Sequence, residues 1–285
     1  MATCVDDLER ELAELRDAST APGEAPNLRT SVLTHVAWVP AEWQDAAEET
    51  LAGLAERHPS RTLLLFPEPD KEDALDMDVS LQCFSVGDKS VCAEVIRVRL
   101  CGDRAHHPAS VLTPLLVPDL TAFCRWRGLP QFDEVFDEVA DVIDRLIVDS
   151  TEWPSDDLSQ GYGELAKRFE SAIVSDIAWA RTQRWRRELA DAWPFEGRTL
   201  SVRGTHAQAL LLGGWLRSRL GHDVEVEHEP ADALLAVSVD GAAIDAPPGE
   251  PPLASDLLSD ELETYTRDRV YEAAVAAAAA TSRRS

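Results

Sequence analysis

Near its start the chain alternates a strand, a helix and a second strand, and this order constrains the fold more than any other feature of the sequence. Residues 30–38 (TSVLTHVAW) and 61–66 (RTLLLF) are short apolar runs typical of buried strands, and residues 41–57 repeat apolar side chains at helical spacing. Two strands joined by such a helix pair in parallel, with a right-handed crossover. The segment therefore predicts an α/β fold with a parallel sheet.

The patterns that follow extend this sheet and then begin a smaller one. In chain order, the other expected elements are an acidic helix at 5–17, a hairpin of strands 79–85 and 89–100, a helix at 108–117, a strand at 120–126, an amphipathic helix from 133, helices at about 157–172 and 174–193, a strand at 198–204, a helix at 206–220, strands at 223–229 and 233–240, and a helix from about 260. They predict an N-terminal helix and linker at 1–27, a Rossmann-like α/β domain at 28–153, and a helical connector with a smaller C-terminal α/β domain at 154–285.

Composition excludes several classes of partner. The 285 residues carry a formal charge of −25, which disfavours nucleic acid and anionic membranes because both attract Lys and Arg. The N-terminus has neither the basic region nor the apolar run of a signal peptide, and no apolar segment approaches the length of a membrane span. Five scattered cysteines do not form a secreted disulfide pattern. We therefore expect a cytoplasmic protein that binds neither nucleic acid nor membrane.

Neither a dinucleotide nor a metal is expected as a cofactor. The loop at 38–42 (WVPAE), which leads from the first strand into its helix, contains no glycine, and Glu42 and Asp45 stand where a phosphate would need backbone N–H groups. This argues against an NAD or NADP site. His106 and His107 are adjacent, but no Cys or His lies at the spacing of a zinc site.

Two cysteines in the predicted hairpin form a redox candidate. If Gly87 and Asp88 occupy a two-residue turn, Cys83 lies directly opposite Cys92, within or at the lower edge of disulfide reach. A one-residue slip would place the two thiols on opposite faces of the sheet. The alternative is a pair of buried, reduced cysteines, which is the usual state in cytosolic strands.

Asp149 and Ser150 close a predicted strand, a position where α/β proteins often place reactive groups. A catalytic nucleophile is one interpretation of Ser150. The other is structural, with Asp149 capping the segment that follows. Neither a Gly-x-Ser-x-Gly elbow nor a phosphate-binding P-loop occurs in the sequence.

Residues 175–193 (SDIAWARTQRWRRELADAW) concentrate tryptophan and arginine on what the spacing predicts to be one helix. Trp185 and Leu189 share its apolar stripe, whereas Trp179 and Arg186, seven residues apart, lie together away from that stripe. Trp and Arg dominate binding hot spots, so this helix is a candidate for holding a partner protein. The alternative is that Trp179 and Arg186 pack the chain's own domains together.

The same segment resembles a known family. Residues 176–181 (DIAWAR) followed by Trp185-Arg186 resemble the DLNWARLTPWR signature of the glucose-6-phosphate dehydrogenase assembly protein OpcA family. The residues RTSVL at 29–33, RHPSR at 57–61 and RLIVDS at 145–150 match in the same order, and VCAE at 91–94 and LLVPDL at 115–120 match more loosely. The resemblance spans about residues 28–221. Ile177 and Ala178 replace the usual Leu and Asn, and Gln183-Arg184 replaces Thr-Pro.

The resemblance implies a non-catalytic assembly factor or allosteric activator without a cofactor of its own. Such a protein binds glucose-6-phosphate dehydrogenase, favours its active oligomer or conformation, and supports NADPH production in the pentose phosphate pathway. It also implies that the stretch near 146–149 is a strand rather than the end of a helix. The candidate partner-binding residues are Trp179, Arg181, Gln183, Trp185 and Arg186. Two other functions stay open: an α/β enzyme acting on a sugar phosphate or nucleotide, and a thiol redox sensor that uses Cys83 and Cys92.

Overall fold

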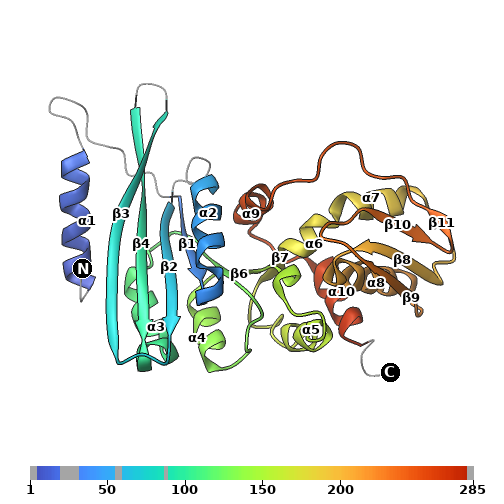
Figure 1. The fold of residues 1–285 in the computed structure, drawn as a ribbon, viewed down its shortest axis with the longest axis horizontal. Helices are drawn as coiled ribbons and strands as arrows, with labels where there is room; N and C mark the ends of the chain where they lie inside the picture. The colour runs from blue at the N-terminus through green and yellow to red at the C-terminus, as the bar shows by residue number, and fades with distance from the viewer. Residues whose placement is uncertain (1–4, 20–31, 55–59, 87–88, 281–285) are drawn as a thin grey trace. The chain divides into compact units, whose positions relative to one another are not determined.

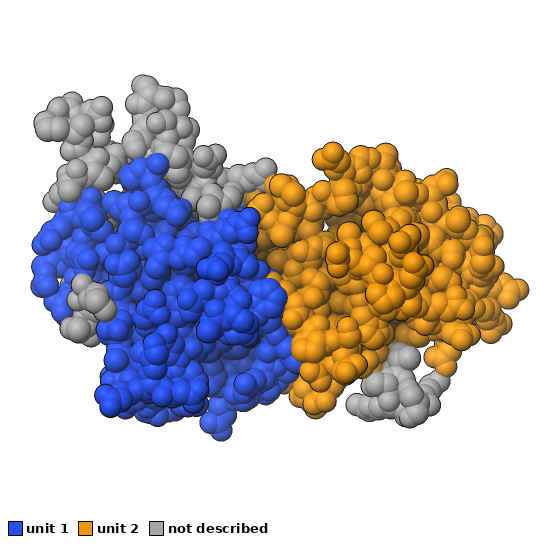
Figure 2. All heavy atoms as spheres, viewed as in Figure 1, with its two compact units in different colours: residues 1–146 blue, residues 147–285 orange. Residues whose placement is uncertain are grey.

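The computed structural model describes residues 5–19, 32–54, 60–86 and 89–280. The chain divides into two compact units, residues 1–146 (unit 1) and residues 147–285 (unit 2), which are coloured separately in Figure 2. The boundary between the units falls a few residues before the predicted domain limit at 153. Whether each predicted domain folds by itself stays a prediction.

The larger sheet has seven strands in the order β3-β4-β2-β1-β5-β6-β7 (Figure 1). They are β1 Leu33–Trp38, β2 Ser60–Glu68, β3 Ala74–Val86, β4 Lys89–Cys101, β5 Ala122–Trp126, β6 Arg145–Val148 and β7 Val174–Asp176. Strand β1 pairs in parallel with β2 and β5, and β2 pairs in parallel with β4, whereas β3 is antiparallel to β4. The predicted mostly parallel α/β sheet is therefore confirmed.

The β-α-β unit predicted at the start of the chain is also confirmed. A short 3-10 turn, Ala41–Trp43, and α2, Gln44–Leu54, connect β1 to β2. Every residue of β1 is buried, as expected for a strand covered on both faces. On one side of the sheet, Ala47 and Leu51 of α2 pack against Leu64, Phe66 and Val95. This apolar layer is the core that α2 contributes to unit 1.

The remaining elements of unit 1 follow the predicted order, with α1 slightly longer and α3 shorter than predicted. Helix α1 (Val5–Ser19) contacts β3. Helix α3 (Pro108–Leu112) continues only as a 3-10 turn, and α4 (Glu134–Val142) begins at Asp133, whose side chain accepts a hydrogen bond from the Phe136 amide. The stretch at 145–148 is strand β6, as the family resemblance implied.

Unit 2 contains a four-stranded sheet in the order β11-β10-β8-β9. Its helices and strands are α5 Leu158–Ala166, α6 Ile177–Arg181, α7 Gln183–Asp191, β8 Thr199–Gly204, α8 His206–Leu220, β9 Glu225–Pro230, β10 Ala236–Val239, β11 Ala242–Ala243, α9 Ala254–Leu262 and α10 Arg269–Ala279. Helix α8 packs against β8, β9 and α10 (Figure 1). Its ends match the prediction because Thr205 and Gln208 form a capping box and Gly221, at φ 73°, ends it in the left-handed conformation.

The single helix predicted at 174–193 is wrong. Strand β7 occupies its start, and Thr182 separates α6 from α7. Asp176 is extended, and its side chain accepts a hydrogen bond from the Ala178 amide, so it caps α6. The Thr182 hydroxyl donates to the Trp179 carbonyl oxygen at 2.7 Å, which satisfies the end of α6. Local side-chain caps at both ends of α6 thus override the apolar periodicity.

Two other predicted helix limits also need correction. The helix predicted at 157–172 ends at Ala166 as α5, and the helix predicted from about 260 is two helices, α9 and α10. Asp268 begins α10 by accepting hydrogen bonds from the Val270 and Tyr271 amides. A cap inside the predicted region therefore starts a new helix.

Candidate functional site

The signature segment places Trp179 at the centre of a buried aromatic cluster in unit 2. The Trp179 side chain is only 4% exposed, and its indole Nε1 donates a hydrogen bond to Asp268 Oδ2 at 2.8 Å. Its ring centroid lies 5.9 Å from that of Tyr271 in α10. The Arg186 guanidinium lies over the ring, 3.4 Å from its centroid. The predicted proximity of Trp179 and Arg186 is confirmed, and both residues hold α6, α7 and α10 together.

Arg186 is unusually well covered for a charged side chain. Burial lowers the pKa of its guanidinium to about 10, while nearby Asp268 works in the opposite direction. Its Nε donates to the Thr182 hydroxyl at 3.1 Å. The ring of Trp179 therefore compensates part of the hydration that the guanidinium loses, as a cation–π contact does.

The other candidate partner-binding residues differ in exposure. Trp185 is 6% exposed and belongs to the apolar core of unit 2 together with Leu189 and Leu200. Gln183 is exposed at the start of α7, and Arg181 is half-buried. Of the five predicted residues, Gln183 is thus the one whose side chain is exposed, whereas both tryptophans are buried.

Arg181 pairs with the aspartate that ends β6. Its Nη1 lies 2.8 Å from both carboxylate oxygens of Asp149, which is 4% exposed. Asp149 Oδ1 also accepts hydrogen bonds from the amide and the hydroxyl of Thr151, so it caps the turn at 150–152. The capping interpretation of Asp149 is confirmed.

Ser150 lies in a buried polar network rather than on a reactive elbow. Its hydroxyl donates to Asp176 Oδ2 at 2.6 Å and lies 2.8 Å from the Tyr162 hydroxyl. Asp176 Oδ1 also accepts hydrogen bonds from the amides of Ser150 and Ala178. Complete burial, aided by the nearby negative charge of Asp149, raises the pKa of Asp176 to about 7. The network ties the end of β6 to the start of α6, and within it the Ser150 hydroxyl is bonded to Asp176 and Tyr162 rather than to a histidine.

The two hairpin cysteines are joined in a disulfide. Cys83 and Cys92 are direct partners in the β3–β4 register, as predicted, with a Cα–Cα distance of 4.1 Å. The expected turn at Gly87-Asp88 lies outside the described residues. Cys83 is exposed and Cys92 half-buried, whereas the free thiols of Cys101 and Cys124 are buried. The alternative of a buried, reduced pair therefore does not hold for Cys83 and Cys92 in this structure.

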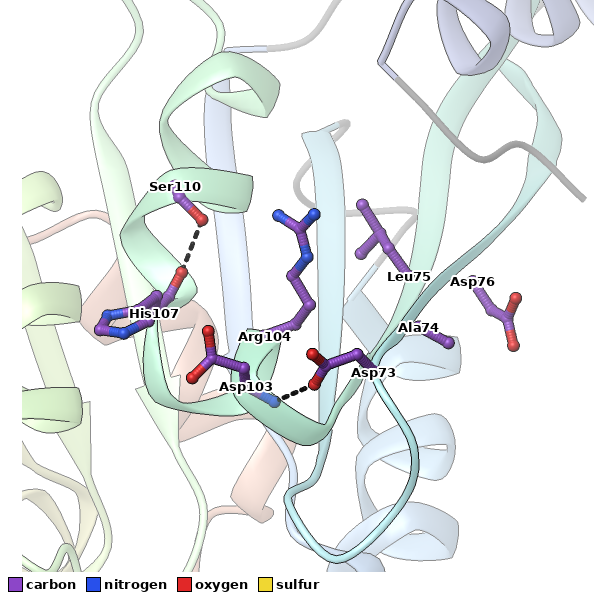
Figure 3. A pocket seen from close by; sticks show the side chains of 8 residues that line it. All are labelled: Asp73, Ala74, Leu75, Asp76, Asp103, Arg104, His107 and Ser110. Carbon is purple, nitrogen blue, oxygen red and sulfur yellow. Dashed lines mark hydrogen bonds between the residues drawn. The ribbon is translucent and has the colours of Figure 1, made fainter.

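A cavity of about 760 Å³ in unit 1 is lined by residues of β3, the 3-10 turn Gly102–His106 and α3 (Figure 3). Figure 3 shows Asp73 and Asp103 next to each other, and the Asp103 amide donates to Asp73 Oδ1 at 2.6 Å. His107, on the same wall, pairs with Glu138 at 3.2 Å. These polar groups stabilise a turn and join two helices, and they do not form a nucleophile with an adjacent base.

Within the described ranges, no group of three or more His, Cys, Asp or Glu side chains is arranged to hold a metal ion. In that same part of the chain, none of the helices combines the length and apolar character needed to span a bilayer.

Sequence reasoning missed three residues of the aromatic and polar clusters: Asp268, Tyr162 and Tyr271. An aspartate preceding a helical pattern is a sequence signal for a cap, and Asp268 could have been found in that way. Its bond to Trp179, 89 residues away, has no local signal because it depends on how α10 packs. Tyr162 and Tyr271 also have no distinguishing local signal, because each stands at an ordinary apolar position of a helix.

Comparison with known proteins agrees with the signature. Residues 51–167 match the family described as glucose-6-phosphate dehydrogenase subunit N-terminal domain, and residues 172–251 match the corresponding C-terminal domain. Relatives from Synechocystis sp. and Nostoc punctiforme, whose names contain the words OxPP cycle protein OpcA, are each 28% identical over 184 and 185 residues. The alignments cover 59% of this chain and 38% and 39% of the two relatives. The chain thus matches well under half the length of these relatives.

The N-terminal match precedes the C-terminal match along the chain, and the second includes Trp179 and Arg186. Between them they take in β6, the buried Ser150 network and the small sheet of unit 2. We conclude that this chain belongs to the OpcA glucose-6-phosphate dehydrogenase assembly family.

Proposed function

We propose that this protein is a non-catalytic partner of glucose-6-phosphate dehydrogenase that favours the active oligomer or conformation of the enzyme. The observation that carries the proposal is the pair of matches to glucose-6-phosphate dehydrogenase subunit domains, one after the other along the chain. In this role the chain supports NADPH production in the cytoplasm, and the dehydrogenase supplies both the cofactor and the catalytic residues.

Activation of this kind sets a simple energetic requirement. The chain must bind the active state of the dehydrogenase more tightly than the inactive state, because equal affinities would leave the equilibrium unchanged. A shift from a few per cent active to mostly active needs about 3–4 kcal/mol of differential binding. One interface of ordinary size with a few anchoring side chains supplies that amount.

The start of α7 is the proposed contact surface. Gln183 is exposed, and the side chains beneath it are fixed by the Trp179–Arg186 contact and by Trp185 in the core. A rigid support lowers the conformational entropy lost on binding. Trp179, Arg181, Trp185 and Arg186 then act mainly by holding Gln183 and its neighbours in place.

The proposal is tested with the cognate dehydrogenase and the purified full chain. We expect co-elution on size exclusion and a change in KM or turnover of the dehydrogenase when the chain is added. Gln183→Ala is expected to weaken binding about fivefold without lowering Tm, because the side chain is exposed. Gln160→Ala, at an exposed position of α5, is the matched control and should bind normally.

Trp179→Ala tests whether this tryptophan supports the proposed contact surface from within the fold. Since Trp179 is buried and bonded to Asp268, this variant is expected to lose both stability and binding. Absence of co-elution together with unchanged dehydrogenase kinetics would refute the proposed function. Normal binding by Gln183→Ala would move the contact surface away from α7 and leave the function itself standing.

A thiol redox sensor is a second candidate function, favoured by the Cys83–Cys92 disulfide, in which Cys83 is exposed. Two-electron reduction by a dithiol such as dithiothreitol breaks the S–S bond, adds two protons and yields two thiols. We expect reduction to alter dehydrogenase activation by the wild-type chain, whereas activation by the Cys92→Ser variant should not respond to the reductant. Cys124→Ser, which removes a buried free thiol, is the control. An identical response of wild type and Cys92→Ser would discard this candidate.

A further inference from the structure

A second cavity, of about 620 Å³, lies within unit 2 where β8 and β9 end. The two strands are parallel, and α8 follows β8 directly, so the cavity occupies the carboxyl-end position at which open α/β sheets bind ligands. Its lining includes two imidazoles, His206 and His228, and the hydroxyl residues Thr151, Ser155 and Thr205. None of these five residues belongs to the proposed dehydrogenase contact on α7.

The two imidazoles form one stacked pair. Their ring centroids are 5.0 Å apart and their planes differ by 12°. His228 Nε2 lies 2.8 Å from the Gly204 carbonyl oxygen, so this nitrogen carries the proton and donates. The His206 ring makes a backbone hydrogen bond to Ser155. Each ring is thus oriented by the backbone through one nitrogen, which leaves its second nitrogen for a ligand.

The groups around the pair act on the pKa of His206. Burial and the neighbouring His228 lower the pKa of His206, whereas Asp156, in the turn before α5, opposes this effect. Asp232, just after β9, also lines the cavity. An anion placed against the His206 ring would favour its protonated form, since an opposite charge stabilises an imidazolium. Binding of an anion should therefore be accompanied by proton uptake.

We propose that this cavity binds a small phosphorylated sugar, with its phosphate against His206 and His228 and its hydroxyl groups toward Asp232. The protonated His206 ring and the hydroxyl of Ser155 supply a charged and a neutral donor of the kind that recognise a phosphate dianion, and the His228 ring stacks against His206. The amides of His206 and Ala207 in the first turn of α8 have no partner within the helix and add donors, whereas the Gln208 amide is capped by Thr205. A carboxylate accepts hydrogen bonds from sugar hydroxyls but repels a bare anion, so Asp232 favours a sugar phosphate over inorganic phosphate.

The test uses the purified full chain alone, so its outcome is independent of dehydrogenase binding. Glucose 6-phosphate, inorganic phosphate and glucose are titrated at pH 6 and pH 8, with calorimetry for affinity and NMR of the imidazole Cε1–H signals for the histidine pKa values. We expect saturable binding of glucose 6-phosphate that is about tenfold tighter at pH 6 than at pH 8, because the His206 imidazole must gain a proton before its second nitrogen can donate to the phosphate. Inorganic phosphate should bind more weakly, and glucose should not bind at millimolar concentration.

Site-directed variants connect the binding to the imidazole pair. His206→Gln should weaken glucose 6-phosphate binding about tenfold because it removes a charge-assisted hydrogen bond, and His228→Gln should also weaken it because it removes the ring that stacks against His206. His106→Gln, at an exposed histidine of unit 1, should bind like the wild type. Tm values confirm that all variants are folded. The proposal is overturned by lack of saturation up to tens of millimolar, by unchanged affinity in both cavity variants, or by inorganic phosphate binding as tightly as the sugar phosphate.

Discussion

Replacement of Asp176 by alanine is expected to lower the free energy of unfolding by about 3 kcal/mol or more. The carboxylate is fully buried and accepts three hydrogen bonds, from the amides of Ser150 and Ala178 and from the Ser150 hydroxyl. Removing it leaves these donors buried without an acceptor and removes the cap of α6. Urea unfolding of the full chain measures the loss.

Asp176 also predicts an unusual dependence of stability on pH. Its pKa is about 7 in the folded chain, above its ordinary value of 3.8. A carboxyl group whose pKa is raised by folding stabilises the protein fully below its unfolded pKa, and this contribution is lost as the pH rises through the folded pKa. The unfolding free energy of the wild type should therefore fall by about 3 kcal/mol between pH 5 and pH 8 relative to a variant that cannot ionise.

Asp176→Asn is that variant. Its amide oxygen retains the two backbone hydrogen bonds, and its NH₂ group donates to the Ser150 hydroxyl, which in turn donates to Tyr162. The difference in unfolding free energy between Asp176→Asn and wild type should shift in favour of the variant as the pH rises. Asp191→Ala, at an exposed aspartate near the end of α7, is the control and should follow the wild type. A difference that stays constant from pH 5 to pH 8 would contradict the raised pKa.

Gly214→Ala is the second substitution with a large expected effect. A Cβ atom at Gly214 of α8 would lie 2.2 Å from the Ala274 carbonyl oxygen and 3.0 Å from the Ala278 amide nitrogen, both on the backbone of α10. Backbone atoms cannot rotate away, so α8 and α10 must separate. We expect a loss of about 2–4 kcal/mol in unfolding free energy and a clear decrease in Tm.

Gly163→Ala provides the matched control for this prediction. Gly163 is also within a helix, α5, and a Cβ atom there would meet only Ala279 Cβ at 4.0 Å, an ordinary contact. Since alanine has the higher helix propensity, this variant should gain up to about 1 kcal/mol. Similar Tm values for the two variants would show that α8 and α10 do not pack as closely as the structure places them.

Much of the fold follows from local patterns in the sequence. The β-α-β unit, the register that opposes Cys83 to Cys92, and the limits of α8 were all predicted, because strand periodicity, turn position and helix caps act over a few residues. Several helix lengths were overestimated for the same reason. Apolar spacing continues beyond the point where Thr182 or Ala166 ends a helix.

Sequence pattern revealed part of the candidate site, and tertiary packing determined the rest. The concentration of Trp and Arg at 175–193 identified the segment that carries the family signature, and the sequence placed Trp179 beside Arg186. It could not determine that Trp179 is buried, because its indole nitrogen bonds to Asp268, 89 positions further along the chain. The stacked pair of His206 and His228 was not foreseen either, since it forms only when α8 folds against β9.

The sequence by itself determined the class of fold, the order of most elements and the family, since each rests on residue types and spacing within short segments. Tertiary structure alone decided which side chains of the signature are exposed, why Asp176 titrates near neutrality, and where the His206–His228 cavity lies. Burial and charge–charge interactions depend on distances in space between residues far apart in the chain, and a linear pattern does not contain those distances.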